Sequence, residues 1–282
     1  MRGKNYMYGK AIELYLENGT ADGLVTAELY NWNGKAIKIP RTEVSDCNRD
    51  DIKGVGVYFL ICKEKDGADS VYIGEAEDVH KRLLDHLYGY EKGSEEYYWV
   101  TAVVFIGQSL NKALIRYLEY RLVEITKECG RSRCLTKNTF KNTVITEAQK
   151  ASMEEFIDNV RILMNTLGYK ILERVPQATD ETVYLYCKNK SGALAKGFVS
   201  AGGFTVLKGS IISNKIVNSF KQFTNYYNLR ISLIEDGTIK DNVFTKDYEF
   251  SAPSAASCVV LGAPSNGRDE WKTEENKKLK EL

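Results

Sequence analysis

Five side chains in the first half of the chain carry the chemistry that this sequence suggests. They are, in chain order, Tyr58, Tyr72, Arg82, His86 and Glu119. Arg82 and His86 are four residues apart, a spacing that on a helix places both side chains on one face, about one turn from each other. Arginine binds a phosphate through two parallel hydrogen bonds, and imidazole takes up a proton near neutral pH, so the pair suits an anionic substrate. The alternative is a solvated helix face on which Asp78 pairs with Arg82.

The two tyrosines belong to short triplets on neighbouring predicted strands. Tyr58 ends the triplet Gly56-Val57-Tyr58, and Tyr72 opens the triplet Tyr72-Ile73-Gly74. Two phenols on adjacent strands can point into one site if they share a face of the sheet. Because the chain has 18 tyrosines, the alternative is that both are ordinary tyrosines of a sheet.

Glu119 is the candidate metal ligand. It lies four residues after Ile115 in a predicted helix, so its carboxylate should stand at the edge of the buried face. One or two carboxylates, together with phosphate oxygens of the substrate and water, are the usual ligands of Mg²⁺. A single glutamate therefore suffices for a site that takes Mg²⁺ or Mn²⁺.

Substrate contacts are expected from residues outside this group. Asn138 in the segment LTKNTF can donate its amide to a phosphate, although such an asparagine is also a common turn former. The other candidates are Gly74, Arg131, Lys137 and Lys208.

The charge of the chain is uneven along the sequence. Its 39 basic and 38 acidic residues give a net charge of +1 over 282 residues, which by itself argues against a nucleic-acid partner. The segment between Glu181 and Glu235, however, has seven lysine or arginine residues and no acid, and residues 129–146 have four cations and no acid. Basic segments interleaved with aromatic residues suit a phosphate backbone, so we expect a nucleic acid, DNA or RNA, as the partner. The alternative is a solvated surface on which other segments balance this charge.

The elements that must position these residues form an α/β or α+β fold. Alternating residues predict β-hairpins over 12–29 and 33–40, a nearly apolar run predicts a strand over 56–62, and a short strand follows at 71–73. The helical period predicts helices from residue 76, over 111–128, and from 146 to a stop at Gly168. We predict a small mixed or antiparallel sheet flanked by helices, a separate N-terminal β-hairpin element and a second, smaller α+β domain. The predicted boundaries are 1–50 for the β leader, 51–145 for the α/β module, 146–173 for a helical extension, 174–182 for a linker and 183–282 for the basic domain.

The compartment is inferred from what the sequence lacks. The N-terminal residues are polar, and no stretch of eighteen uncharged apolar residues occurs, so we expect neither secretion nor a membrane span. The expected location is the cytoplasm.

Taken in order, the motifs over residues 54–140 resemble those of the GIY-YIG endonuclease superfamily. The chain departs from that pattern by Val57 in place of isoleucine and by a longer loop between the triplets. The resemblance implies a phosphodiester hydrolase with one divalent metal on Glu119, an arginine at the scissile phosphate and tyrosines that position or activate the water. Which of Tyr58, Tyr72 and His86 accepts the proton stays open, because an ordinary phenol, with a pKa of about 10, is a poor base.

The C-terminal segments GFTVLKGS and FSAPSAASCVVLGAPSNGRDEW resemble a domain of unknown function that accompanies restriction-modification modules. The leading hypothesis is thus a metal-dependent DNA endonuclease with a C-terminal domain that aids DNA binding. One alternative is an inactive nucleic-acid-binding adaptor that keeps the nuclease fold. Another is a protein-interaction module whose tyrosines are structural.

Overall fold

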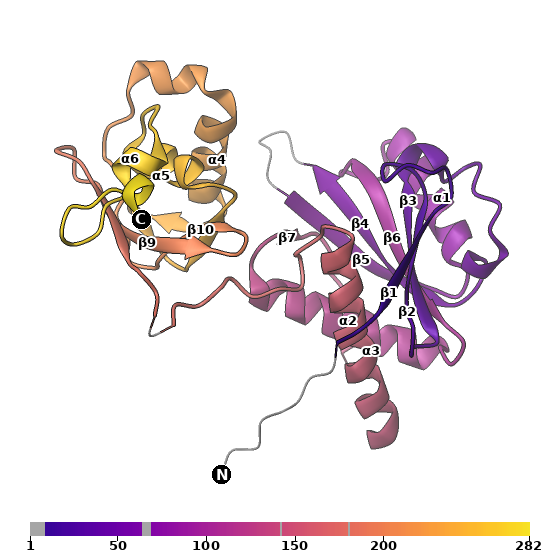
Figure 1. Ribbon diagram of the computed structural model, residues 1–282. Coiled ribbons are helices and arrows are strands. Elements are labelled where there is room, and N and C mark those ends of the chain that lie inside the picture. The colour runs from indigo at the N-terminus through magenta and orange to yellow at the C-terminus, as the bar shows by residue number, and fades with distance from the viewer. Residues whose placement is uncertain (1–8, 64–68, 142, 180) are drawn as a thin grey trace, which may run out of the picture. The chain divides into compact units, whose positions relative to one another are not determined.

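The computed structural model describes residues 9–63, 69–141, 143–179 and 181–282, and its fold is mixed α+β (Figure 1). The chain forms two compact units whose boundary along the sequence lies between Glu173 and Arg174. None of the helices in the described ranges is long and apolar enough to cross a membrane.

The first unit is built around one sheet of seven strands, with spatial order β1-β2-β3-β6-β4-β5-β7. In chain order the strands are β1 Ile12–Leu16, β2 Val25–Leu29, β3 Gly34–Pro40, β4 Gly56–Lys63, β5 Asp69–Ala76, β6 Trp99–Gly107 and β7 Arg133–Cys134. The helices are α1 Val79–Glu91, α2 Lys112–Cys129 and α3 Glu147–Thr166. Neighbouring strands pair antiparallel except for β5 and β7, which are parallel.

The first three strands continue this sheet, which corrects the expectation of a separate leader. Strand β3 pairs with β6 along its whole length, from Gly34 opposite Gly107 to Pro40 opposite Thr101. The alternating pattern identified the hairpins correctly, but it does not reveal which strand a hairpin edge will meet, because that pairing joins residues about seventy positions apart.

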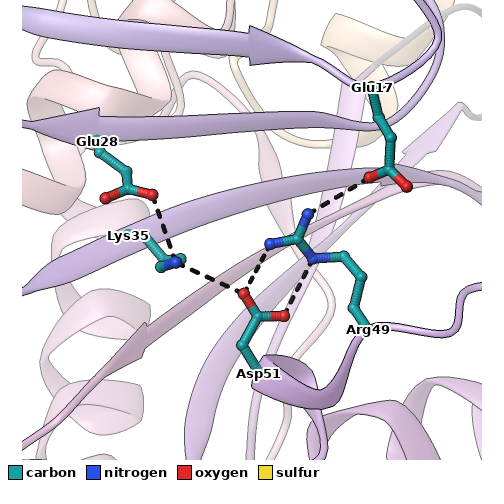
Figure 2. Close-up of polar contacts among 5 residues, drawn as sticks. All are labelled: Glu17, Glu28, Lys35, Arg49 and Asp51. Carbon is teal, nitrogen blue, oxygen red and sulfur yellow. Dashed lines mark hydrogen bonds and ion pairs between the residues drawn. The ribbon is translucent and has the colours of Figure 1, made fainter.

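Ion pairs add to this attachment (Figure 2). Arg49 binds Asp51 through two hydrogen bonds of 3.0 and 2.7 Å and approaches Glu17 at 3.4 Å. Lys35 of β3 lies between Glu28 of β2 and Asp51, at 3.3 and 3.6 Å. The turn before β4 is therefore tied to all three N-terminal strands, since Glu17 directly follows β1.

The two faces of the sheet carry different helices. Val57, Phe59 and Ile61 of β4 lie in the core that includes residues of α2 and α3. The alternate residues, Tyr58 and Leu60, lie in the core that includes residues of α1. The period of two along a strand thus directs Tyr58 toward α1.

The helix starts follow the local capping chemistry. Asp78 accepts the Lys81 amide at the start of α1, Asn111 accepts two amides at the start of α2, and Thr146 opens α3 with a capping box. Gly168, with φ 92°, follows the end of α3 as expected. Strand β5 is longer than the sequence indicated, because its pairing with β4 continues to Ala76, and α1 therefore begins at Val79 rather than directly after Gly74.

The second unit is a smaller α+β structure. Its strands are β8 Leu185–Lys188, β9 Leu194–Ser200, β10 Gly203–Val206, β11 Ile239–Lys240, β12 Val243–Phe244 and β13 Tyr248–Phe250, and its helices are α4 Thr224–Glu235, α5 Pro253–Leu261 and α6 Gly267–Glu270. The main sheet has the order β13-β10-β9-β8, and β11 and β12 form a two-stranded sheet. The core of this unit includes Phe204 and Trp271, whose ring centroids are 4.3 Å apart.

Candidate active site

Tyr58, His86 and Glu95 form a buried line of hydrogen bonds. The Tyr58 hydroxyl lies 2.8 Å from Nε2 of His86, and Nδ1 of His86 lies 2.6 Å from Oε1 of Glu95. Tyr58 and His86 are each only 1% exposed, so water competes little for these bonds. The line joins strand β4, helix α1 and the loop after α1.

The chemistry of the three groups fixes the direction of these bonds. An ionised carboxylate only accepts, so the proton of the neutral imidazole must be on Nδ1, where it is donated to Glu95. Nε2 then carries the lone pair and accepts the Tyr58 proton. Burial, followed by the charge of Arg82, lowers the pKa of His86 to about 3, so the imidazole is neutral at physiological pH.

Arg82 lies among the phenols at the start of α1. It interacts electrostatically with both Tyr58 and Tyr72, and each interaction opposes the increase in phenol pKa that burial causes. Burial is the larger effect, so the pKa of Tyr58 stays well above that of a free phenol. The ring of Tyr72 stacks on Tyr97 with centroids 5.4 Å apart and an interplanar angle of 16°. Arg82 is therefore placed to stabilise negative charge near either hydroxyl.

Glu119 joins this group from α2, on the opposite face of the sheet. It interacts electrostatically with both Tyr72 and Arg82, although Tyr72 packs on the α1 side. Because α2 packs on β5, the strand that carries Tyr72, the cluster lies around β5. The structure brings Tyr58, Tyr72, Arg82 and His86 close together, and Glu119 is linked to Tyr72 and Arg82 through their charges.

The environment of Glu119 fits a divalent cation. Its side chain is 7% exposed, and it makes neither a hydrogen bond nor an ion pair with any residue in the described ranges. Burial, followed by repulsion from Glu75, raises the pKa of Glu119 to about 7. A buried carboxylate with no donor and a second carboxylate nearby is the donor set that Mg²⁺ or Mn²⁺ would satisfy, with phosphate and water as the remaining ligands. Groups of three or more metal-ligating side chains are not found within the described ranges.

Glu75 connects this carboxylate pair to two cations of α2. Lys112 Nζ lies 2.9 Å from Glu75, and Arg116 Nε lies 3.8 Å from it. These cations lower the pKa of Glu119, but less than burial and Glu75 raise it. The region around Glu119 is thus dense in charge of both signs.

Gly74 has a packing role. It lies directly opposite Tyr58 in the sheet, and a Cβ atom added at Gly74 would collide with the Tyr58 hydroxyl. The glycine therefore leaves room for the phenol that bonds His86. It was predicted to contact substrate, and this geometry gives it a different task.

The other predicted substrate contacts are not gathered into the cluster. Asn138 and Lys137 are exposed, two and one residues beyond Thr136, whose hydroxyl bonds the backbone of Ile73 in β5. Arg131 donates its Nε proton to the carbonyl of Glu173 at 2.9 Å, so this bond contributes to the fold.

Lys208 belongs to the second unit, where it is exposed. Its backbone amide donates to Asp247 at 2.8 Å, a bond that orders the turn after β10. The side chain of Lys208 therefore stands at the surface of that unit, beyond the end of β10.

Three residues at the site were missed by the sequence reasoning, namely Glu75, Glu95 and Tyr97. Glu75 directly follows the second triplet, and the strand period indicates that it faces away from Tyr72, toward α2. Glu95 and Tyr97 lie in a polar loop, KGSEEYYW, whose composition gives no indication that it folds back on α1.

The basic stretch of the second unit divides into two kinds of residue. Arg230 is 2% exposed and donates to the backbone carbonyls of Val259, Val260 and Ser213, so it supports the fold. Lys196 instead lies over the ring of Tyr184, with Nζ 3.7 Å from the centroid.

Comparison with known proteins identifies one part of the chain. Residues 185–282 match a family model described as a domain of unknown function (DUF4357). This agrees with the expectation that a domain of that kind forms the C-terminal part, whereas the nuclease superfamily that residues 54–140 resemble is not matched. Neither a curated protein nor a solved structure matches the chain.

Proposed function

We propose that this protein is a metal-dependent endonuclease that hydrolyses phosphodiester bonds of DNA, with its site around β5 of the first unit. The observation that carries the proposal is the convergence of five motif residues from β4, β5, α1 and α2, each of which interacts with at least one other. Structural tyrosines alone would not require a buried carboxylate without a hydrogen-bond donor near a partly exposed arginine.

The hydrogen-bond line supplies a route for the proton of an attacking water. The water oxygen forms a bond to phosphorus while its proton passes to the Tyr58 oxygen, and the Tyr58 proton passes to Nε2 of His86. Glu95 then stabilises the resulting imidazolium through the bond to Nδ1. Of the three acceptors that the sequence left open, the raised phenol pKa disfavours either tyrosine alone, and the lowered pKa of His86 weakens the imidazole as a base. Transfer through Tyr58 to His86 therefore depends on Glu95, which stabilises the imidazolium as it forms.

Arg82 and the metal ligand Glu119 act on the phosphate. Arg82 is placed to bind the phosphate oxygens as negative charge accumulates on them. Glu119 would hold Mg²⁺ or Mn²⁺, which would supply Lewis-acid stabilisation of the negative charge at the phosphate. The P–O bond to the leaving strand end breaks as the water oxygen adds.

The second unit is proposed to aid DNA binding. Tyr186 and Lys196 are direct partners across β8 and β9, and Lys188 and Lys196 lie near the Tyr186 ring. Lysines held over tyrosine rings combine charge for phosphates with rings for bases. This face is the surface by which the matched domain would contact the nucleic acid.

The test is cleavage of labelled duplex, flap and single-stranded DNA, and of RNA, in Mg²⁺ or Mn²⁺ and in EDTA. We expect cleavage that requires the cation and is lost in Glu119→Gln. Glu124→Gln is the matched control on the same helix, since Glu124 bonds Tyr120 and Arg121 at the surface. Equal cutting by both variants would overturn the proposal. DNA binding without cleavage would indicate the inactive adaptor instead.

A further inference from the structure

A cavity of about 700 Å³ lies beside the candidate site, between the start of α2 and the segment after Thr136. Of the eight residues that line it, three are basic, namely Lys112, Arg116 and Lys141, and none is acidic. A cavity of this size accommodates a small organic group, and its lining selects an anion.

The basic residues of this cavity are only partly neutralised. Lys112 is shared between Glu75 at 2.9 Å and Glu77 at 3.5 Å, while Arg116 has the longer contact of 3.8 Å to Glu75. The Arg116 Nε is also buried without a hydrogen-bond acceptor among the residues that the structure describes. A phosphate oxygen at the cavity would provide an acceptor for this guanidinium.

Phe140 adds an aromatic surface to the same cavity. Its side chain is 53% exposed although it is large and apolar, and the Arg116 guanidinium carbon lies 4.2 Å from the ring centroid. The cation thus holds one side of the ring, while the exposed part is accessible from the solvent. Nucleobases stack on exposed aromatic rings of this kind, with little dependence on sequence.

Helix α2 carries two of the cavity's three basic residues and the candidate metal ligand Glu119. Lys112, Arg116 and Glu119 follow the spacing i, i+4, i+7 and therefore share one face of α2. A rise of about 1.5 Å per residue separates Arg116 and Lys112 from Glu119 by about 4.5 and about 10.5 Å along the axis. One strand of a duplex advances about 3.4 Å per nucleotide, so these distances correspond to about one to three nucleotides.

We infer that this cavity binds a nucleotide of the substrate strand within about three positions of the scissile phosphate. Its base stacks on Phe140, and its phosphate pairs with Lys112, Arg116 and Lys141. The inference rests on the proposed nuclease function for its reference point, the scissile bond. Binding of the nucleotide itself requires no cleavage.

The first experiment scans an abasic residue along a labelled DNA strand. Binding is measured by fluorescence anisotropy in EDTA with the Glu119→Gln protein, and the cleavage position is mapped separately with the unaltered protein. We expect binding to weaken about tenfold when the abasic residue falls at one position within about three nucleotides of the cleavage point. Adding Phe140→Ala should abolish this position dependence, whereas Phe140→Tyr should keep it. A flat scan, or the same scan in Phe140→Ala, would overturn the inference.

The second experiment tests the charge of the cavity by salt dependence. Lys141→Gln should reduce the slope of log affinity against log salt by about one unit. Lys150→Gln, an exposed lysine on α3, is the matched control and should leave the slope unchanged. Equal slopes for both variants would remove Lys141 from the proposed contact.

The two proposals fail in different ways. If the unaltered protein cleaves nothing but Phe140→Ala still weakens DNA binding, the nuclease proposal falls and the nucleotide site stands. If cleavage occurs and both the abasic scan and the salt slope are insensitive to the cavity variants, the nuclease proposal stands and the cavity has no part in it.

Discussion

Two arginines, one in each unit, lie in opposite surroundings: Arg230 is buried, whereas Arg82 is partly exposed. Arg230 in the second unit donates to three backbone carbonyls, from Ser213, Val259 and Val260. Arg82 in the first unit faces two phenols whose pKa values are raised, so its partners remain neutral. The buried guanidinium of Arg230 is thus compensated by backbone dipoles, whereas the partly exposed guanidinium of Arg82 receives no full negative charge from the two phenols.

The difference shows how a structural cation and a functional one can be told apart. A guanidinium with its donors used by the backbone has little capacity left for a ligand. One that faces neutral hydroxyls keeps much of its positive potential available for an anion. The sequence alone does not distinguish Arg82 from Arg230, whereas the groups around each guanidinium do.

The largest effect that would test this comparison is expected from Arg82→Met. This change keeps the length of the side chain and removes the charge, so phosphodiester cleavage should fall about 10³-fold. Stability should change little, because Arg82 is partly exposed and forms no ion pair with a carboxylate among the described residues. Cleavage rates and denaturant midpoints measure the two quantities. A loss of folding with full activity per folded molecule would reverse the assignment.

The converse change, Arg230→Met, should act on the fold. Three buried carbonyls lose their donor, so we expect a loss of about 3 kcal/mol in the free energy of unfolding of the second unit. Cleavage of a short substrate by the folded protein should be retained. Urea unfolding followed by circular dichroism measures the loss. A stable Arg230→Met variant that no longer binds DNA would place this arginine with Arg82 as a functional cation.

Much of the frame was predictable from the sequence because it depends on local chemistry. Alternating residues give the strands, and Asn111 and Thr146 mark the starts of α2 and α3 by their capping side chains. Non-local pairing was not predictable, so the attachment of β3 to β6 was missed. The end of the short strand at Gly74 was also misplaced, since the pairing of β4 with β5, and not the glycine, determines where the strand stops.

The candidate site shows the same division. Tyr58, Arg82 and His86 follow from motif order and helical spacing. Glu95 could not be predicted, because a loop residue nine positions after His86 reaches it only through the path of the chain. Lys208 was selected for its charge, and it belongs to the second compact unit, whereas the five motif residues belong to the first.

Glu95 lies at the far end of the hydrogen-bond line from Tyr58, one of the two phenols that Arg82 faces. Glu95→Gln can donate its amide to Nδ1 of His86, which would move the imidazole proton to Nε2 and block acceptance from Tyr58. We expect cleavage to fall about 10²-fold. The control is Glu96→Gln, since the neighbouring Glu96 is exposed. In a Tyr58→Phe background the Glu95→Gln change should have no further effect, and additive losses would show that Glu95 acts elsewhere.

The smallest predicted effect concerns Glu119 and pH. The pKa of Glu119 is raised to about 7 by burial and Glu75, so the folded state binds its proton more tightly than the unfolded state. Below the pKa that Glu119 has in the unfolded state, both states carry the proton and the free energy of unfolding is unaffected. The free energy of unfolding then falls as the pH rises toward and past 7, the pKa of Glu119 in the folded state. Without divalent cations, Glu119→Gln should therefore gain on the unaltered protein with rising pH, by about 1 kcal/mol or roughly 3 °C in Tm at pH 8. Mg²⁺ should close this difference, because it binds the ionised carboxylate that the variant lacks. Thermal unfolding at pH 5.5 and 8, with Mg²⁺ and with EDTA, measures the difference in Tm between the variant and the unaltered protein. A difference that is the same at both pH values would show that Glu119 is already ionised and compensated by the cations around it.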